Sequence, residues 1–329
     1  MSNQPSVLEL FAGAGGLALG IEKAGMKTVG LVECDKNCVQ TLKNNKPKWN
    51  VVFSKVEDMD CKQFKGVDII SGGFPCQPFS FAGKRLGFKD KRGNLFFEMM
   101  RPIREIKPKI VLCENVNGLL AHDGGKALKT IISTLKKENY GVHCQVLNAL
   151  DFGVPQKRKR LIIIAVRKRK KILPIPIPKV KVKTIKEALK KCPPSPGYEY
   201  SLEKRNVMKL IPPGGCWNSL PKKTQKKYMG LSYGHTSHMG GRSGMARRMS
   251  WDEPSFTILC SPSQNRSERC HPAETRPFTI RESARLQTFP DSWVFCGSVA
   301  SQYRQIGNAV PVKLAKKIAE HVLNIYNSF

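Results

Sequence analysis

The ten residues Ser71-Gly-Gly-Phe-Pro-Cys-Gln-Pro-Phe-Ser80 have the composition of a loop that holds a reactive thiol. Glycines lead into Pro75, which restrains the backbone directly before Cys76, and a second proline follows closely. A cysteine buried for packing alone needs neither feature, whereas an activated thiol must be both constrained and accessible. The loop follows an apolar run at residues 66–70, and α/β enzymes place their sites where such strands end. We therefore expect Cys76 to act as a nucleophile.

Two polar residues, Glu114 and Asn115, follow another apolar run, at residues 109–113. If both runs are strands of one parallel sheet, Glu114 lies on the same edge as Cys76. A carboxyl group beside a thiol can act as an acid or as a hydrogen-bond donor. A solvated carboxylate at the end of a strand is the alternative.

Gln156, Arg158 and Arg160 alternate with lysines in a segment of strand character. Alternation places these three side chains on one face of a strand, where they can orient a base or a phosphate. Lys157 and Lys159 fall on the opposite face, for which a solvated basic stripe is the simpler interpretation.

A glycine-rich turn, Phe11-Ala-Gly-Ala-Gly-Gly16, separates a short apolar strand from a helix. Gly13, Gly15 and Gly16 allow the backbone to approach a ligand at a helix N-terminus. Glu33 ends the next expected strand, twenty residues after Gly13, where a carboxylate can bind ribose hydroxyls. The pattern also fits an ordinary tight turn, since it is G-x-G-G instead of G-x-G-x-x-G.

Strand and helix patterns alternate through the first half of the chain. Apolar runs predict strands at residues 6–10, 27–32, 66–70, 109–113, 143–147 and 160–166, and helical periodicity predicts helices at 127–137, 279–287 and 312–326. This alternation is typical of an α/β fold with a doubly wound, Rossmann-like and mostly parallel sheet.

Domain boundaries are indicated by a change of composition. Leu173-Pro-Ile-Pro-Ile-Pro178 cannot be helical and predicts an extended connector. We expect a first domain at residues 1–172 that carries the site and any cofactor. A smaller, irregular, β-containing domain is expected at residues 173–273, and a C-terminal segment at 274–329 is expected to return to the first domain.

The chain is strongly basic. Its 56 Lys and Arg against 25 Asp and Glu give a net charge of +31 over 329 residues, and fifteen of these cations with a single acid fall within residues 157–191. Self-repulsion on this scale is relieved by a polyanion. Nucleic acid is the natural partner, because neutralising its phosphates releases counterions. An anionic membrane surface is the main competitor, and a generally lysine-rich composition is the simplest alternative.

The eleven cysteines form no C-x-x-C pair, so the sequence predicts no zinc site and no other metal site. No apolar run is long enough to span a bilayer, and the first residues lack the features of a secretory signal. An odd number of cysteines without such a signal indicates free thiols in a reducing compartment. We therefore expect a cytoplasmic protein.

Taken in order, these motifs resemble those of the cytosine-C5 DNA methyltransferases of prokaryotic type. The matching motifs are the glycine-rich turn, Pro75-Cys76-Gln77, Glu114-Asn115-Val116, Gln156-x-Arg158-x-Arg160, Arg281-Glu282-x-x-Arg285-x-Gln287-x-Phe289-Pro290 and Gly307-Asn308-Ala309-Val310-Pro311. The series spans nearly the whole chain, and residues 175–273 correspond to the family's variable target-recognition region. The resemblance implies the fold of the S-adenosylmethionine-dependent methyltransferases and transfer of a methyl group to carbon 5 of a cytosine in double-stranded DNA.

The resemblance also implies the roles of the catalytic residues. Cys76 is the thiolate that adds to carbon 6 of the cytosine, which makes carbon 5 nucleophilic. Glu114 holds ring nitrogen 3 and the exocyclic amine, and Arg158 steadies the base and the Cys76 loop. Asn115 and Arg160 support the pocket.

For the cofactor, S-adenosylmethionine, the resemblance implies that Phe11 packs on the adenine and that Glu33 holds the ribose. The other residues expected at this site are Gly13, Gly15, Gly16, Cys34, Val56, Pro75, Leu95, Asn308 and Val310. Two positions depart from the family pattern. Ser54-Lys55-Val56 stands where an Asp usually meets the adenine amine, so that either Asp58 substitutes or the contact is lost. Cys34 stands where a large side chain often stacks.

The target cytosine is inaccessible inside a duplex and is expected to be flipped out. Residues 79–93 resemble the mobile loop that closes over it. The expected DNA contacts are Ser80, Arg92, Gln156, Arg242, Arg247 and Thr257. Arg248, Arg266 and Arg269 also suit phosphate or guanine contacts.

Three alternatives stay open. A tRNA cytosine methyltransferase shares the fold but usually has a much smaller recognition region. A catalytically silent DNA-binding protein would not require Cys76 and Glu114. A nicotinamide-dependent oxidoreductase would not account for these two residues or for the excess of positive charge. We expect the protein to act on DNA as a monomer. A cognate restriction endonuclease in the same cell is a further partner that the resemblance suggests.

Overall fold

The computed structural model describes residues 4–74, 95–225, 246–262 and 268–329, and the chain folds as two compact units. Unit 1 comprises residues 1–152, 158–180 and 309–329, and unit 2 comprises residues 153–157 and 181–308. The sequence placed boundaries after residues 172 and 273, whereas the units change after residues 180 and 308. The later boundary arises because helix α8 (Ile280–Leu286) packs against α5 (Ile185–Leu189) and α9 (Val299–Asn308) of unit 2.

Unit 1 is built on a seven-stranded sheet with the order β3-β2-β1-β4-β5-β8-β6. Its strands are β1 (Ser6–Leu10), β2 (Lys27–Glu33), β3 (Val51–Phe53), β4 (Ile69–Gly72), β5 (Ile110–Val116), β6 (Tyr140–Asn148) and β8 (Lys159–Arg167). The five strands from β3 to β5 are parallel, and β8 is antiparallel to its neighbours β5 and β6. The predicted α/β fold with a doubly wound, mostly parallel sheet is confirmed.

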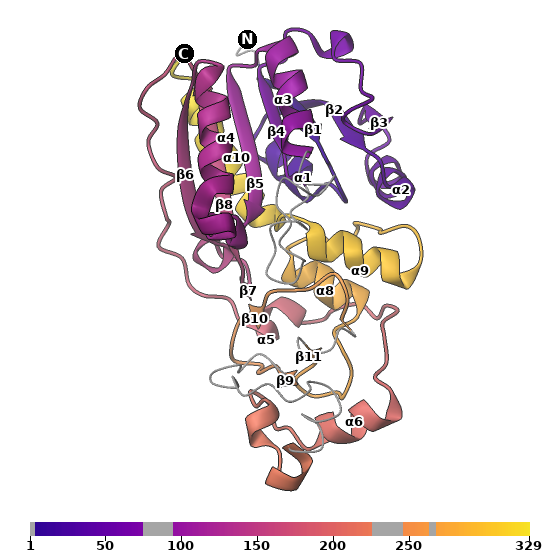
Figure 1. Ribbon diagram of the computed structural model, residues 1–329. Coiled ribbons are helices and arrows are strands. Elements are labelled where there is room, and N and C mark those ends of the chain that lie inside the picture. Colours follow the sequence, from indigo (N-terminus) through magenta and orange to yellow (C-terminus); the bar gives the residue numbers. More distant parts are fainter. Residues whose placement is uncertain (1–3, 75–94, 226–245, 263–267) are drawn as a thin grey trace. The chain divides into compact units, whose positions relative to one another are not determined.

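Helices cover both faces of this sheet, and α4 and α10 lie on opposite sides of it (Figure 1). The helices of unit 1 are α1 (Gly16–Lys23), α2 (Lys36–Asn45), α3 (Leu95–Ile106), α4 (Lys126–Lys137) and α10 (Val312–Tyr326), with short 3₁₀ turns at Lys62–Phe64, Asn117–Leu120, His122–Gly125 and Ala149–Phe152. This arrangement explains why residues 161–166 of β8 are all buried, since a strand covered on both faces is apolar throughout.

Helices α1 and α10 pack together at a glycine. A Cβ placed on Gly20 would lie 2.4 Å from the Ala315 Cβ and 2.7 Å from the Ala315 carbonyl carbon. Only the missing side chain allows the two backbones to come so close, because Cβ atoms do not approach backbone atoms to that distance. The contact anchors the C-terminal helix beside the helix that follows the glycine-rich turn.

Unit 2 contains little regular structure, as its glycine- and proline-rich sequence predicted. Its elements are α5, α6 (Leu202–Lys209), a 3₁₀ turn at Trp217–Ser219, α8, α9 and the short strands β7 (Gln156–Lys157), β9 (Arg247–Arg248), β10 (Ser255–Phe256) and β11 (Arg269–Cys270). The strands form two parallel pairs, β7 with β10 and β9 with β11. The predicted smaller β-containing domain is confirmed.

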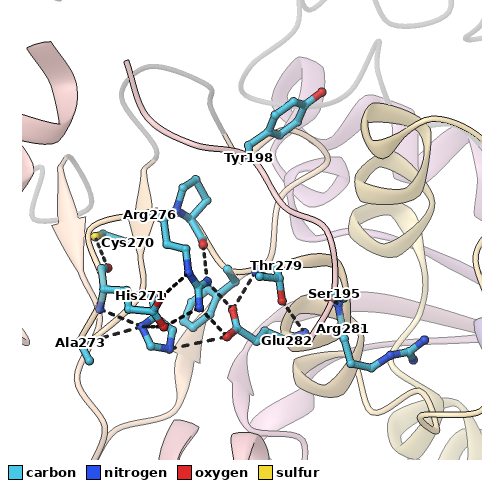
Figure 2. Close-up of polar contacts among 12 residues, drawn as sticks. Ser195, Tyr198, Cys270, His271, Ala273, Arg276, Thr279, Arg281 and Glu282 are labelled. Atoms are coloured by element: carbon cyan, nitrogen blue, oxygen red, sulfur yellow. Dashed lines mark hydrogen bonds and ion pairs between the residues drawn. The ribbon is translucent and has the colours of Figure 1, made fainter. Parts of the chain in front are cut away.

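A cluster of polar contacts lies at the start of α8 in unit 2. Arg276 donates to Glu274 Oε1 over 2.7 Å and to Glu282 Oε2 over 2.8 Å, and Glu282 also accepts from the backbone of Thr279 in a capping box at the start of α8 (Figure 2). The imidazole Nδ1 of the buried His271 accepts from the backbone N–H of Glu274 over 3.0 Å. Breaking a partly buried pair leaves a charge without its partner, so we expect this cluster to fix α8 within unit 2.

Among the described residues, no helix is long and apolar enough to cross a membrane.

We predict that Gly20→Ala destabilises the protein, although Ala normally favours a helix over Gly by up to about 1 kcal/mol. The added methyl group must push α10 away from α1, and overpacking of this kind costs about 1–3 kcal/mol. Thermal unfolding followed by circular dichroism should show a lower Tm than in the wild type. Lys23→Ala, at an exposed position of the same helix, is the matched control and should leave the Tm almost unchanged. An equal or higher Tm for Gly20→Ala would contradict the packing argument.

Candidate active site

The ends of strands β4 and β5 are held against each other at the edge of the sheet of unit 1. In their parallel register Gly72, the last residue of β4, lies opposite Cys113. Asn115 donates its side-chain N–H to the carbonyl oxygen of Phe74 over 3.2 Å, and a Cβ on Gly73 would lie 3.2 Å from Glu114 Oε2. Glu114 and Asn115 therefore contact the two residues that directly precede Pro75 and Cys76.

The sequence suggested that β5 ends at residue 113, but it continues to Val116. The extension exists because Glu114, Asn115 and Val116 pair with β8. Since β8 is antiparallel, it begins at the edge where β5 ends and brings its first residues there. The Nε of Arg160 consequently lies 2.9 Å from Glu114 Oε1, and both side chains are nearly buried. This ion pair fixes the orientation of the Glu114 carboxyl group.

Arg158 is the largest fully buried side chain of the described residues, at 1% exposure. Its Nη2 donates to the carbonyl oxygen of Ala309 over 3.1 Å, and its backbone N–H donates to Asn148 Oδ1. Arg158 thereby ties the start of β8 to the segment that leads into α10. The hydrogen bond to Ala309 holds the guanidinium group in its buried position, which suits a residue that orients other groups.

Gln156 does not share the surroundings of Arg158 and Arg160, although their alternation placed all three on one face. It belongs to β7 of unit 2, and its side chain is fully buried. The amide donates to the Leu286 carbonyl and to Gln287 Oε1 and accepts from the backbone N–H of Ile258. Its hydrogen-bonding capacity is used within unit 2, and a direct contact of Gln156 with DNA is therefore not proposed.

Pro75, Cys76, Ser80, Arg92 and Arg242, for which the sequence predicted catalytic, cofactor-binding or DNA-binding roles, lie outside the described residues, as do residues 79–93. Among the described cysteines, Cys34 is exposed beside Glu33, and partial burial together with the charge of Glu33 raises the pKa of its thiol. A raised pKa leaves less of the thiolate at neutral pH, so these surroundings do not favour Cys34 as a nucleophile.

The glycine-rich turn and Glu33 form one hydrogen-bonded unit. Glu33 Oε2 accepts from the backbone N–H of Gly13 over 2.7 Å, and its Oε1 accepts from Cys34 and Asp35 over 2.8 and 2.7 Å. Gly13 and Gly15 have positive φ angles of 55° and 81°, and Gly15 precedes the first residue of α1, Gly16. The carboxylate that the sequence singled out therefore accepts a hydrogen bond directly from the turn.

Phe11 also adopts a positive φ of 56°, which residues with a side chain rarely do. Outliers of this kind cluster at functional sites, because the surrounding structure must hold them in place. A Cβ on Gly13 would meet no atom of the described residues within 4 Å, so among these residues the turn borders open space. Phe11 is half-buried against the core beside that space.

Glu9 and Ser71 are two buried polar residues that the sequence analysis missed. They are register partners in β1 and β4, with exposures of 2% and 0%. Glu9 Oε2 and Ser71 Oγ have no hydrogen-bond partner among the described residues. Burial raises the pKa of Glu9 well above its ordinary value; a backbone hydrogen bond from Ala18 opposes this, and Glu33 adds to it. An acid within the apolar run Ser6-Val-Leu-Glu-Leu10 was the signal in the sequence.

Four further residues of the predicted cofactor site are described. Val56 is buried, and Arg101 holds its carbonyl oxygen over 2.7 Å, while Leu95 is half-buried at the start of α3. Val310 is buried in unit 1. Asn308 belongs to unit 2, where its side-chain oxygen accepts from the Cys260 thiol.

Adenosine and amino-acid groups fit the chemistry of this edge of unit 1. The glycines of the turn leave its backbone accessible at three positions, Glu33 supplies a carboxylate for hydroxyl groups, and Glu9 and Ser71 supply buried polar atoms that have no hydrogen-bond partner among the described residues. Asp58, the predicted substitute for the adenine contact, is exposed, as is Lys55. No cluster of three or more metal-ligating side chains occurs among the residues that the structure describes.

Comparisons with known proteins agree with this description. The chain matches the model of the C-5 cytosine-specific DNA methylase family over residues 6–324. It is 50% identical to the type II methyltransferase M.Sau96I of Staphylococcus aureus and 49% identical to M.Eco47II of Escherichia coli; each match covers 98% of this chain, and 77% and 80% of those proteins.

Two solved structures resemble the whole chain in fold. A DNA modification methyltransferase encoded within a prophage of E. coli has a TM-score of 0.72 at 24% identity and covers 98% of this chain and 100% of its own. The Dnmt2 methyltransferase of S. pombe has a TM-score of 0.68 at 18% identity and covers 99% and 100%.

We predict that Glu9→Gln stabilises the protein at alkaline pH and has little effect at acidic pH. Because the folded pKa of Glu9 is raised, folding favours the protonated acid, and stability is lost as pH rises from the unfolded value of about 4.3 toward the folded pKa. The Tm of Glu9→Gln should therefore exceed that of the wild type at pH 8, and the difference should shrink toward pH 4.5. Glu57→Gln, on the surface, is the control. A difference in Tm that does not change with pH would contradict this account.

Proposed function

Because the chain belongs to the C-5 cytosine-specific DNA methylase family and is a DNA cytosine methyltransferase, we propose that it methylates carbon 5 of cytosine in duplex DNA through a covalent adduct with Cys76. The observation that carries the proposal is the contact of Asn115 and Glu114 with Phe74 and Gly73. It supports an arrangement in which a carboxyl group and a thiol act on one base.

The proposed chemistry begins with the thiolate of Cys76. Carbon 5 of cytosine is a weak nucleophile, and addition of sulfur to carbon 6 makes it enamine-like. Glu114 holds ring nitrogen 3 and the exocyclic amine, and protonation at nitrogen 3 favours the addition. Once carbon 5 carries the methyl group, a base or a water molecule removes the proton from carbon 5, the double bond between carbons 5 and 6 forms again, and the bond between carbon 6 and the sulfur of Cys76 breaks.

The remaining residues are proposed to position these groups. Asn115 fixes the backbone that leads into Cys76, since its side chain donates a hydrogen bond to the carbonyl oxygen of Phe74. Arg160 orients the Glu114 carboxyl group through their ion pair. Arg158 steadies the base near its carbonyl oxygen, and its buried, bonded guanidinium group suits that task. A displacement of about 1 Å in such a site can cost about 10²-fold in rate.

We propose that S-adenosylmethionine is the cofactor, which supplies an electrophilic methyl group when bound. Glu33 would take the ribose hydroxyls, and Phe11 would pack on the adenine, beside the open space at Gly13. Gly15, Gly16, Cys34, Val56, Pro75, Leu95, Asn308 and Val310 are proposed to complete the site.

A role in restriction–modification is proposed from the relatives, which are named type II methyltransferases. In this role the enzyme would protect chromosomal DNA in the cytoplasm of a prokaryotic cell against a cognate endonuclease. The net charge of +31 supports duplex DNA as the substrate. Ser80, Arg92, Arg242, Arg247 and Thr257 are proposed to contact it.

The covalent step can be tested with duplex DNA that carries 5-fluorocytosine in place of cytosine. Fluorine at carbon 5 cannot be removed as a proton is, so the adduct should persist. With S-adenosylmethionine, the wild type should give a protein–DNA complex that survives denaturing electrophoresis, and Cys76→Ser should give none. Glu114→Gln should form the complex on the order of 10²-fold more slowly.

Cys192→Ser is the matched control, because this half-buried thiol lies in unit 2 and has no proposed role. It should form the complex at the wild-type rate. A denaturation-resistant complex with Cys76→Ser would overturn the assignment of the nucleophile.

A further inference from the structure

A short loop of unit 1, residues 54–61, follows strand β3 at the edge of the sheet where Glu33 lies. Strands β2 and β3 are parallel, and their register brings the end of β3 beside Glu33. The backbone N–H of Ser54 donates to the carbonyl oxygen of Glu33 over 3.1 Å. Burial raises the pKa of the Cys34 thiol, and the charges of Glu33 and of Glu57 in this loop add to it. The loop therefore borders the carboxylate that is proposed to bind ribose.

One guanidinium group of helix α3 holds this loop. Nη2 of Arg101 donates to the carbonyl oxygens of Val56, Met59 and Glu57 over 2.7, 2.8 and 3.3 Å. Its Nη1 lies 3.2 Å from the sulfur of Cys61. Carbonyl groups outside regular structure need donors, and arginine carries five N–H donors in one plane. A single side chain thus sets the direction of three peptide groups of the loop.

The core of unit 1 holds the loop from its other side. Three of its side chains are buried in the same apolar cluster as Met99 and Ile103 of α3, namely those of Val56, Met59 and Cys61. Lys55, Glu57 and Asp58 are exposed. Burial of the apolar side chains decides where the loop lies, and the hydrogen bonds from Arg101 decide how its peptide groups point.

Arg101 also takes part in an ion pair. Its Nη1 lies 3.2 Å from Oε1 of Glu105, one turn further along α3, and both side chains are partly exposed. An ion pair of this kind on a helix surface stabilises a protein only slightly. Since Glu105 engages Nη1 and the loop carbonyls engage Nη2, the two roles of Arg101 can be separated by mutation.

We propose that Arg101 is a positioning residue for the cofactor, because it holds residues 54–61 in the conformation that receives the nucleoside end of S-adenosylmethionine. The proposal rests on the proposed function, which assigns the ribose to Glu33 and a cofactor contact to Val56. Lys55 stands where an acid is expected to meet the adenine amine, so recognition of the base depends more on the peptide groups of the loop. A loop that is already ordered loses less entropy when a ligand binds, which raises affinity.

The test measures binding by the full-length protein in the absence of DNA. Calorimetric titration with S-adenosylhomocysteine should give a Kd for Arg101→Met on the order of tenfold above that of the wild type, because the loop must then be ordered on binding. Adenosine, which lacks the amino-acid end, should be weakened by the same factor. In the cofactor-free protein, amide hydrogen exchange at residues 55–61 should be faster in Arg101→Met than in the wild type.

Three variants serve as controls. Arg101→Lys should recover most of the affinity, because the three donors of an ammonium group can replace Nη2. Glu105→Gln removes the ion pair and keeps the loop contacts, so it should bind as the wild type does. Arg104→Met removes an arginine of the same helix that pairs with Glu138 over 2.7 Å, and it should also bind normally.

Steady-state kinetics separate positioning from a general loss of structure. Arg101→Met should raise the KM for S-adenosylmethionine on the order of tenfold, while kcat at saturating cofactor should stay within about twofold of the wild type. Its Kd for duplex DNA should not change. If Arg101→Met does not fold, Arg101→Gln serves in the same assays and should shift Kd and KM in the same direction.

Wild-type values of Kd and of hydrogen exchange in a folded Arg101 variant would overturn the proposal. An equal loss of affinity in Glu105→Gln would overturn it as well, since the ion pair would then be responsible. Unchanged binding of adenosine would contradict the assignment to the nucleoside end. Failure of the proposed function is recognised separately, because the wild-type protein would then bind no S-adenosylhomocysteine.

Discussion

The contact between the ends of β4 and β5 is the constraint on which the active site depends. Asn115 bonds the carbonyl oxygen of Phe74, and Glu114 lies against Gly73, so the backbone is fixed directly before Pro75 and Cys76. The parallel register of the sheet determines that these ends meet, and the antiparallel β8 adds Arg160 from the other side. The rest of unit 1, including the close packing of α1 on α10, keeps this edge in place.

The same edge is where unit 1 departs from the rules that stabilise a fold. Glu9 is buried within strand β1 with an oxygen that has no partner among the described residues, Ser71 beside it in β4 also has an unpartnered oxygen, and Phe11 adopts a backbone conformation unfavourable for its type. Departures of this kind persist when function requires them. In unit 2, the cations of Lys157, Arg247 and Arg269 around the Phe256 ring concentrate positive charge, which is likewise unfavourable for the stability of a fold.

Much of unit 1 could be predicted from the sequence, because its strands are apolar runs and its site residues follow them directly. Glu33 was found because the spacing from Gly13 is characteristic. The sequence did not show that Gln156 belongs to another unit than Arg158, since alternation cannot reveal that the chain passes between units at residues 153–158. Helix α2 was not predicted, although Asp35 caps it through Asn37 and Cys38. The cluster around Phe256 could not be predicted, because two-residue strands leave no periodic pattern and the β7–β10 pair joins segments about 100 residues apart.

The central claim is that this chain methylates carbon 5 of cytosine and that Cys76 is indispensable for it. The most direct measurement is bisulfite sequencing of DNA from a methylation-free host that expresses the wild type or Cys76→Ser. Our account predicts protected cytosines within one short motif in the wild type alone. Protection that persists in Cys76→Ser, or none in cells that contain folded wild-type protein, would contradict it.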